Sequence, residues 1–441
     1  MEWTPEVKQF ITDHLMDDTA RLLLSAHRYP FLDMPFIVEQ IEARRRLRTK
    51  LPEWFSNPDL IMGGRIPAEQ CSSEQTARYK RSLLTGCRSL CDMTGGMGVD
   101  FWYMSRGLHH AIYTECQPHL IQAARHNFAA LQSASAPTLQ SASDSALSSP
   151  SAVGDDAPSS LPTIQVRQGL STQLPIPDVD AIYLDPARRS NTGSRIYEVE
   201  DCEPNVIAWQ DDLLPHCSLL ITKLSPMADI HRTLQRLRRV TAVHVVSVRH
   251  ECKELLFVQK GLASDTSVLS CSSAHVDDVV SSLPPLTLHC IDFLPSGPVT
   301  FQCSLSDLHA AAPVASSLSD AQYLYEPDVS LMKAQAFAPL AQRIPVQMLE
   351  ANTHLFVSSQ PLPHFPGRAF VIEQVLPFAS RQLKQLRKAI PQANVATRNF
   401  PLTPEAFRSR TGIRDGGDLY LFGCTTYAEG PLLFLCHKLV P

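Results

Sequence analysis

The feature that most constrains the fold is a glycine-rich turn between an expected strand and an expected helix. The apolar run 89–92 leads into a turn that carries Gly95, Gly96 and Gly98, and a helix is expected from Val99. Glycine allows a backbone to approach a ligand closely, and the first N–H groups of a helix are free to bind one. Such a turn holds a nucleotide-like cofactor at the carboxyl edge of a parallel sheet, but an ordinary turn fits the pattern equally well.

Strands and helices alternate along the chain from the strand that precedes this turn. We expect strands at 89–92, 111–115, 163–166, 181–185, 218–223, 242–248 and 254–258, with helices between most of them. This alternation predicts a parallel, doubly wound sheet that one antiparallel strand closes. The expected fold class is therefore α/β, with a Rossmann-like sheet, N-terminal helices and two small C-terminal α+β domains.

Changes in composition indicate where the parts of the chain begin and end. Thr4 and Pro5 are typical of a helix start, and the basic helix 34–49 fits either a solvated face or a face that contacts RNA phosphates. The Ser/Ala/Pro-rich stretch 133–163 cannot bury enough apolar surface to order itself. We expect a helical region at 1–62, an α/β domain at 63–262 with a flexible insertion at 133–163, and small α+β domains at 263–320 and 321–441.

Charge and cysteine spacing exclude several classes of protein. A net charge of -5 argues against a protein that coats nucleic acid indiscriminately, but it permits a local basic groove. The 12 cysteines include no Cys-x-x-Cys pair, so we expect no zinc-ribbon or iron–sulfur metal site. With a polar, acidic start and no apolar run of about 18 residues, the chain is expected to be cytoplasmic, with reduced thiols and no membrane span.

Polar residues and turns follow the ends of four successive expected strands. They are Asp92, Glu115, the turn 169–171 and Asp185. In an open α/β sheet, ligands bind beyond the carboxyl ends of the strands. Glu115 lies 17 residues beyond Gly98, close to the spacing at which an acid accepts hydrogen bonds from ribose hydroxyls.

This combination resembles class I S-adenosylmethionine-dependent methyltransferases over residues 63–260. The resemblance implies a methyltransferase sheet and the cofactor S-adenosyl-L-methionine. It also implies that Glu115 holds the ribose and that the methionine part is surrounded by Asp92, Thr94, Gly95, Gly96 and Gly98. Leu170 stands where many such enzymes offer an acid to adenine, which leaves adenine to backbone and apolar contacts.

The segment after the fourth expected strand carries a second resemblance. Asp185-Pro186-Ala187-Arg188 resembles the Asp/Asn-Pro-Pro-aromatic motif of methyltransferases that modify exocyclic amino groups of bases. Asp185 and the Pro186 carbonyl would accept hydrogen bonds from the amino group, so that catalysis is mainly positioning. Arg188 replaces the aromatic residue and can stack on a base or hold a phosphate. The alternative is an Asp-Pro turn without chemistry.

Substrate contacts are expected from the same edge of the sheet. Arg189, Lys223 and Ser225 are predicted to line the substrate pocket, although 223–226 fits a plain turn capped by Ser225 equally well. Neither the 185–188 segment nor the 223–226 segment contains a cysteine, which argues against cytosine-C5 chemistry.

The flanking motifs resemble a bacterial family of the Bacteroidetes type that joins a class I methyltransferase domain to a ferredoxin-like domain and a C-terminal THUMP-like domain. The motifs are 69–74, 92–100, 183–189, 223–227, 323–327, 365–368 and 416–420. THUMP domains bind structured RNA, so the resemblance implies a tRNA or rRNA partner. Arg368 and the basic helix 381–388 would supply phosphate contacts, although a basic amphipathic helix is also ordinary.

The leading hypothesis is an S-adenosylmethionine-dependent methyltransferase that methylates a base nitrogen of structured RNA positioned at Asp185 and Pro186. One alternative keeps the enzyme but changes the acceptor to a protein or a small molecule. The other is a non-catalytic RNA-binding protein on a methyltransferase scaffold, which the altered 185–188 motif and the missing adenine acid motivate.

Overall fold

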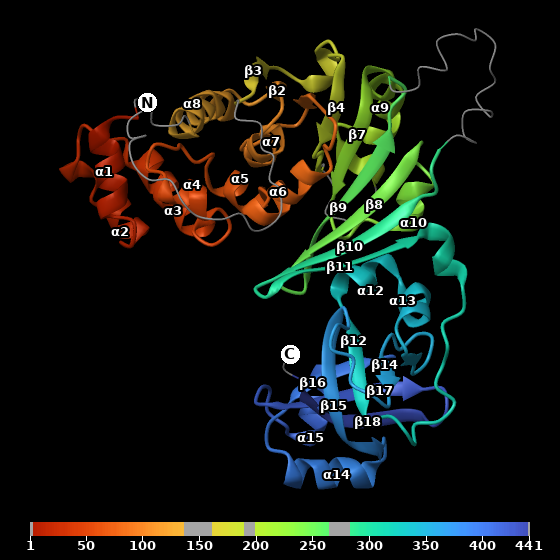
Figure 1. The fold of residues 1–441 in the computed structure, drawn as a ribbon. Helices are drawn as coiled ribbons and strands as arrows, with labels where there is room; N and C mark the ends of the chain where they lie inside the picture. The colour runs from red at the N-terminus through yellow and green to blue at the C-terminus, as the bar shows by residue number, and fades with distance from the viewer. Residues whose placement is uncertain (1–2, 136–160, 189–198, 264–282, 440–441) are drawn as a thin grey trace, which may run out of the picture. The chain divides into compact units, whose positions relative to one another are not determined.

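The computed structural model describes residues 3–135, 161–188, 199–263 and 283–439 (Figure 1). Arg189 and most of the expected insertion 133–163 lie outside the described residues. Contacts divide the chain into two compact units: 1–224 with 231–239 and 258–281, and 225–230 with 240–257 and 282–441. None of the described helices has the length and apolar character that a membrane-crossing segment requires.

The first unit begins with short helices whose starts are set by local capping. They are α1 (Pro5–Asp13), α2 (Thr19–Leu24), α3 (Met34–Leu47), α4 (Pro52–Ser56), α5 (Arg65–Gln70) and α6 (Glu74–Ser82). Asp33 accepts a hydrogen bond from the N–H of Phe36 at the start of α3, and Ser73 accepts one from Thr76 at the start of α6. These caps satisfy N–H groups that a helix start leaves without a partner.

Arg44 of α3 shows why the basic run in this helix is not simply a surface feature. Its guanidinium is buried and donates to the backbone carbonyls of Asn57, Pro58 and Leu60. Burial lowers the pKa of Arg44 to about 10. Arg44 therefore neither lies on a solvated face nor contacts RNA phosphates, because its N–H donors bind the backbone of the loop after α4.

A parallel sheet forms the core of the first unit. Its strands are β1 (Ser89–Asp92), β2 (His110–Glu115), β3 (Thr163–Gln168), β4 (Val179–Leu184) and β7 (Cys217–Leu224), in the order β3-β2-β1-β4-β7. The neighbouring strands in this order are all parallel to each other. The chain order reverses between β1 and β4, which brings the segments after these two strands together at a switch point.

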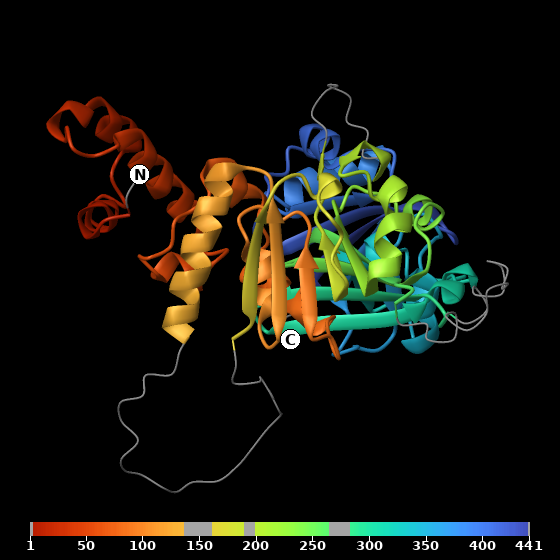
Figure 2. The ribbon, with the colours of Figure 1, turned by 90° about the horizontal axis from the view of Figure 1, so that it is seen from above.

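Helices pack against this sheet through apolar residues. They are α7 (Val99–Ser105), α8 (Pro118–Ser135) and α9 (Val206–Leu213), and Figure 2 shows α8 alongside the parallel strands. Phe101 of α7 and Phe128 of α8 lie with ring centroids 5.0 Å apart, and Phe128 lies 5.3 Å from Tyr113 of β2. The expected α/β class with a mostly parallel sheet is confirmed. After β4, a short antiparallel pair joins β5 (Ala187–Arg188) to β6 (Cys202–Glu203).

The second unit contains strands on both sides of the boundary expected at 262–263. They are β8 (Val240–Val248), most of β9 (Glu251–Lys260), β10 (Thr287–Leu294) and β11 (Gly297–Ser304), and α10 (Ile230–Leu234) precedes them in the chain. β10 pairs with β8 in parallel and with β11 antiparallel. The expected boundary therefore falls inside a run of hydrogen-bonded strands.

The C-terminal part of the second unit is built on one seven-stranded sheet. Its strands are β12 (Tyr323–Pro327), β13 (Gln347–Met348), β14 (Phe356–Ser358), β15 (Gly367–Pro377), β16 (Asn394–Arg398), β17 (Leu419–Thr426) and β18 (Gly430–Lys438), in the order β13-β14-β12-β15-β18-β17-β16. Its helices are α12 (Val329–Ala334), α13 (Phe337–Arg343), α14 (Ser380–Ala389) and α15 (Pro404–Thr411). Leu383 and Leu386 of α14 pack with Phe407 and Leu433, so the polar residues of α14 face away from this core.

Candidate active site

The glycines of the turn after β1 occupy their positions for different physical reasons. A Cβ on Gly95 would lie 2.2 Å from the Tyr113 ring, and one on Gly98 would lie 2.8 Å from the Phe128 ring. These two glycines allow the turn to pack against the core. Gly96 adopts a positive φ of 56°, but a Cβ there would meet only the Thr94 carbonyl oxygen, at 3.8 Å. The space beside Gly96 is therefore the part of the turn that remains open to a ligand.

Glu115, at the end of β2, holds this turn in place. Its Oε2 accepts a hydrogen bond from the N–H of Gly96 at 2.8 Å. Its Oε1 accepts from the N–H groups of Cys116 and Gln117, both at 2.8 Å. A carboxylate has about four acceptor positions, so these three bonds leave limited capacity for a further hydroxyl group.

The segments after β1 and β4 are joined by hydrogen bonds through Thr94. Its N–H donates to Asp92 Oδ1 at 2.9 Å, and its hydroxyl oxygen accepts from the N–H of Asp185 at 2.6 Å. The N–H of Met93 also donates to the Tyr183 carbonyl, at 3.1 Å. The structure therefore brings three of the predicted site residues, Asp92, Thr94 and Asp185, to the same edge of the sheet.

Lys223, near the end of β7, forms an ion pair with Asp185. Its Nζ lies 2.5 Å from Asp185 Oδ2 and 3.5 Å from Asp100 Oδ2. Within the described residues, the other oxygen of Asp185, Oδ1, accepts no hydrogen bond, and the side chain is partly exposed. Asp185 thus has one oxygen held by a cation and one that is available to a bound group.

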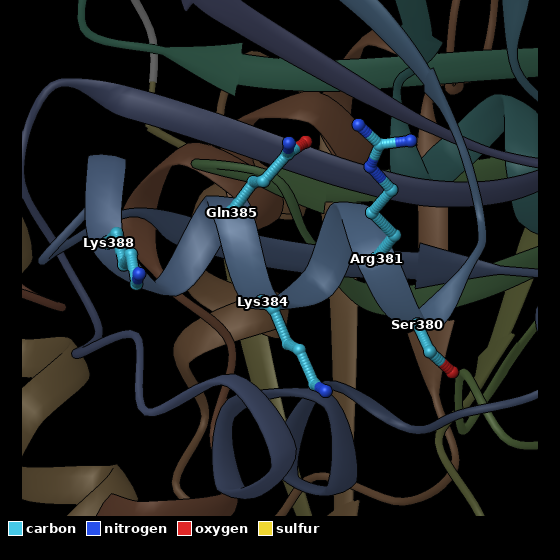
Figure 3. A pocket seen from close by; sticks show the side chains of 5 residues that line it. All are labelled: Ser380, Arg381, Lys384, Gln385 and Lys388. Atoms are coloured by element: carbon cyan, nitrogen blue, oxygen red, sulfur yellow. The ribbon is translucent and has the colours of Figure 1, made fainter.

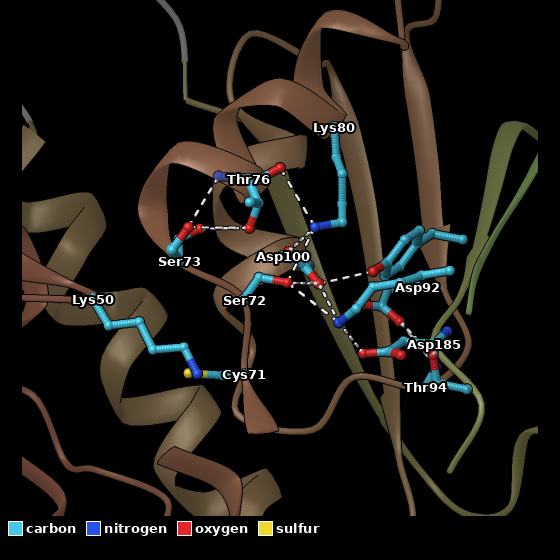
Figure 4. A network of polar contacts seen from close by, with 12 residues as sticks. Lys50, Cys71, Ser72, Ser73, Thr76, Lys80, Asp92, Thr94, Asp100 and Asp185 are labelled. Carbon is cyan, nitrogen blue, oxygen red and sulfur yellow. Dashed lines mark hydrogen bonds and ion pairs between the residues drawn. The ribbon is translucent and has the colours of Figure 1, made fainter. Parts of the chain in front are cut away.

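Behind this pair lies a buried polar network centred on Asp100 of α7 (Figure 4). Lys80 of α6 is 0% exposed, and its Nζ lies 3.1 Å from Asp100 Oδ1. Asp100 Oδ2 accepts hydrogen bonds from Ser72 at 2.8 Å and from the Tyr183 hydroxyl at 2.7 Å. The network therefore connects α6, α7, β4 and, through Lys223, the end of β7.

The electrostatics differ between the two buried aspartates. Burial alone would raise the pKa of Asp100, but the ammonium groups of Lys80 and Lys223 lower it well below its usual range. Burial raises the pKa of Asp92 well above its usual range, because only the Thr94 N–H opposes this shift. Within the described residues, Asp92 forms no ion pair. A buried carboxylate without a cation favours a positively charged ligand.

Several other predicted site residues take different positions. Pro186 is buried, Leu170 is 48% exposed after β3, and the backbone of Arg188 pairs with Cys202, while nothing is described of the Arg188 side chain. Ser225 belongs to the second unit, where its hydroxyl accepts from the N–H of Met227 at 3.2 Å, as the interpretation of a capped turn expects.

Two residues of the network had no role in the sequence interpretation. Asp100 lies within the otherwise apolar run 99–104, and every residue of this run is buried. Lys80 lies on α6, where Ala77 on the same helix is also buried. A charged residue within an apolar run is a signal for a buried ion pair, but its partner cannot be read from spacing along the chain.

In the second unit, α14 carries the predicted basic surface. Figure 3 shows a surface pocket on this helix lined by Ser380, Arg381, Lys384, Gln385 and Lys388. Arg381, Lys384 and Lys388 are exposed and recur at helical spacing. Arg368 instead contacts the buried Glu326, which also pairs with Arg398 at 2.7 Å, so one carboxylate is shared by two guanidinium groups.

Two family models match the C-terminal part of the chain. A ferredoxin-like domain model matches residues 323–366, and a THUMP domain-like model matches residues 367–438. Both expected domain types are therefore present. The ferredoxin-like match lies at 323–366, whereas the sequence interpretation placed this domain at 263–320.

A solved structure aligns with nearly the whole chain. It is a candidate methyltransferase from Porphyromonas gingivalis W83, 31% identical, with 99% of this chain and 98% of that chain covered and a TM-score of 0.78. Trm5b from Pyrococcus abyssi is 10% identical, with 43% of this chain and 49% of that chain covered and a TM-score of 0.28.

The Pyrococcus abyssi tRNA (uracil-54, C5)-methyltransferase, solved with S-adenosyl-L-homocysteine, is 11% identical, with 46% of this chain and 40% of that chain covered and a TM-score of 0.28. No curated protein matches the chain.

Proposed function

The chain belongs to the same family as the Porphyromonas gingivalis protein, and from this premise we propose that it transfers a methyl group from S-adenosylmethionine to structured RNA. The observation that carries the proposal is the placement of Asp185 beside the glycine turn. Its N–H is fixed by Thr94 and its Oδ2 by Lys223, while Oδ1 remains available. A fixed acceptor next to a cofactor turn suits catalysis by positioning.

The charges at this edge of the sheet fit a cationic cofactor. Four carboxylates, those of Asp92, Asp100, Glu115 and Asp185, are accompanied by two ammonium groups, those of Lys80 and Lys223. S-adenosylmethionine carries a sulfonium and an ammonium group, and it supplies an electrophilic methyl group when bound. Asp92 would hold it, the open space beside Gly96 would accommodate it, and the turn would exclude water from its methyl group.

On the acceptor side, this chain supplies orientation. Asp185 Oδ1 and the Pro186 carbonyl would accept hydrogen bonds from an amino group of a base, which directs the nitrogen lone pair. The ion pair with Lys223, 2.5 Å from Oδ2, would hold the Asp185 carboxylate in place for this contact. Leu170, exposed after β3, would offer apolar contact to adenine.

Replacing Asp92 by asparagine tests the cofactor assignment. We expect the affinity for S-adenosylmethionine to fall by about 10- to 100-fold, because a charge-assisted contact contributes about 1.5–3 kcal/mol. Asparagine keeps an oxygen for the Thr94 N–H, so the turn should remain folded. Calorimetric titration of the full chain measures the effect.

The matched control for this titration is Asp178→Asn, which changes an exposed carboxylate that precedes β4 at the opposite end of the strand. Equal affinity in Asp92→Asn and the parent would contradict the role of Asp92. If the parent itself binds no S-adenosylmethionine, both enzyme hypotheses fail and the non-catalytic scaffold is the better account.

The RNA partner is supported by the THUMP-like match and by the exposed basic residues of α14. We expect the double variant Arg381→Glu/Lys384→Glu to weaken tRNA binding and to reduce the slope of log affinity against log salt by about 2, because each lost phosphate contact removes about one released counterion. Filter binding at several salt concentrations measures both quantities.

The control for RNA binding is Arg21→Glu, which changes an exposed arginine in the first unit. A loss of affinity of the same size in this control would indicate a general charge effect. An unchanged salt slope in the α14 variant would contradict the role of that helix.

A further inference from the structure

Three ionisable side chains meet in the second unit, outside the site described above. His250 lies in the two-residue connection between β8 and β9, Asp292 lies near the end of β10, and Asp328 precedes α12. His250 Nδ1 is 3.0 Å from Asp292 Oδ2 and 3.1 Å from Asp328 Oδ2. One potential ligand atom from each of the three side chains lies within 4.8 Å of the others.

The two carboxylates of this cluster are buried and share one imidazole. Asp292 is 1% exposed and Asp328 is 4% exposed. The single nitrogen between them, His250 Nδ1, carries at most one proton, so it can donate a well-aligned hydrogen bond to only one of them. Two buried acids this close favour a further positive charge.

A fourth polar side chain lies in the same region. Ser247 of β8 is fully buried, and its hydroxyl interacts with the Cys252 thiol. Ser247 pairs with Asp292 across the parallel strands β8 and β10, so both side chains project from the same face.

We propose that His250, Asp292 and Asp328 bind a divalent transition-metal ion of the Zn²⁺ class. Imidazole nitrogen and carboxylate oxygen bind zinc at about 2.0–2.2 Å, which places neighbouring ligand atoms of a tetrahedron about 3.3 Å apart. The distances of 3.0 and 3.1 Å from Nδ1 to the two carboxylate oxygens are close to that value. The half-exposed His250 leaves one side of the site accessible to an entering ion.

Each proposed ligand is already held by its own surroundings. Asp328 Oδ1 accepts from the N–H of Ser330 at 2.8 Å and from its hydroxyl at 2.7 Å, which leaves Oδ2 for the ion. Asp292 accepts from the N–H of His250. A bound ion would tie the start of α12 to the end of β10. It would therefore stabilise the second unit, independently of whether the first unit binds S-adenosylmethionine.

The test titrates the EDTA-treated full chain with Zn²⁺ and with Co²⁺. One equivalent of Zn²⁺ is expected to raise the Tm, and Co²⁺ is expected to give visible d–d absorption without the charge-transfer bands of thiolate ligands. Both signals should be lost in His250→Ala and in Asp292→Asn. His250 is partly exposed, so its alanine variant should fold, which circular dichroism in EDTA verifies.

The matched control is His437→Ala, which removes an exposed imidazole that lies 3.1 Å from one carboxylate, that of Glu373. This variant should keep both signals. The proposal is overturned if the parent shows no saturable change with either ion, or if His250→Ala keeps the change, since the ion would then bind at other histidines or cysteines. Loss of the signals in His437→Ala as strongly as in His250→Ala would also overturn it.

Discussion

Replacing Lys80 by methionine is expected to lower the free energy of unfolding by about 3–5 kcal/mol, because it removes the closer of the two ammonium partners of the buried Asp100 and leaves it with Lys223 at 3.5 Å. Lys80 is 0% exposed and lies 3.1 Å from the buried Asp100. Methionine preserves most of the side-chain volume, so a cavity contributes little. Urea unfolding of the full chain, followed by circular dichroism, measures the change.

The surface pair of Lys8 and Asp59 provides a matched control. Its atoms are 2.6 Å apart, but both side chains are partly exposed. Lys8→Met should therefore change stability by only about 0–1 kcal/mol. The double variant Lys80→Met/Asp100→Asn should lose less than the sum of the two single variants, because it removes the uncompensated charge together with its partner. Equal effects of Lys80→Met and Lys8→Met would contradict this account.

The same network predicts a dependence of stability on pH. The pKa of Asp100 is lowered in the folded protein, with its two lysine neighbours opposing the effect of burial. A group with a lowered folded pKa stabilises the protein above its unfolded pKa of about 3.9, and this stabilisation is lost as the pH falls towards the folded value. Lys80→Met should therefore show a weaker loss of stability on acidification than the parent shows.

Asp185→Ala is expected to reduce methyl transfer by about 100-fold or more, because it removes the group that would orient the acceptor. Asp185→Asn keeps one acceptor oxygen and should retain more activity than alanine. Affinity for S-adenosylmethionine should fall less in both variants than methyl transfer does, since the Asp185 side chain makes no hydrogen bond to the turn, which it contacts through its backbone N–H. Comparing the loss of methyl transfer with the loss of cofactor affinity separates a role in positioning the acceptor from a role in supporting the cofactor turn.

The readout for Asp185 is mass spectrometry of nucleosides from tRNA and rRNA of a deletion strain complemented with each variant. The parent should restore a methylated nucleoside, and Asp185→Ala should not. Asp178→Ala, which changes an exposed carboxylate that precedes β4, should behave as the parent. A deletion strain whose RNA nucleosides are unchanged would count against RNA as the acceptor and favour a protein or small-molecule acceptor. Full restoration of the methylated nucleoside by Asp185→Ala would contradict a catalytic role of this residue.

Local sequence patterns were sufficient to predict much of the fold. The apolar runs at 89–92 and 181–185 correspond to β1 and β4, and the glycines at 95 and 98 stand where a side chain would overlap an aromatic ring. Periodicity and turn chemistry are local properties, so they are visible along the chain. The domain division was less accessible, because pairing of β10 with β8 depends on contacts between distant segments.

The roles of charged side chains depended on the tertiary structure. Sequence reasoning expected Lys223 to contact substrate, but the structure pairs it with Asp185 and with Asp100. It expected no metal because cysteine pairs are absent, whereas the cluster inferred to bind an ion draws His250, Asp292 and Asp328 from three separate segments. Ligand sets of this kind leave no spacing signature, since the chain between their members has no fixed length.

The sequence alone determined the parallel sheet and the glycine turn, because each rests on residues close together in the chain, while motifs spread from 69 to 420 carried the resemblance to a methyltransferase with a THUMP-like tail. Only the tertiary structure decided which charges meet. Lys223 and Asp100 lie 123 positions apart, yet Nζ of one and Oδ2 of the other are 3.5 Å from each other. The fold sets that distance by the order of its strands, and burial then makes the pairing of those charges obligatory.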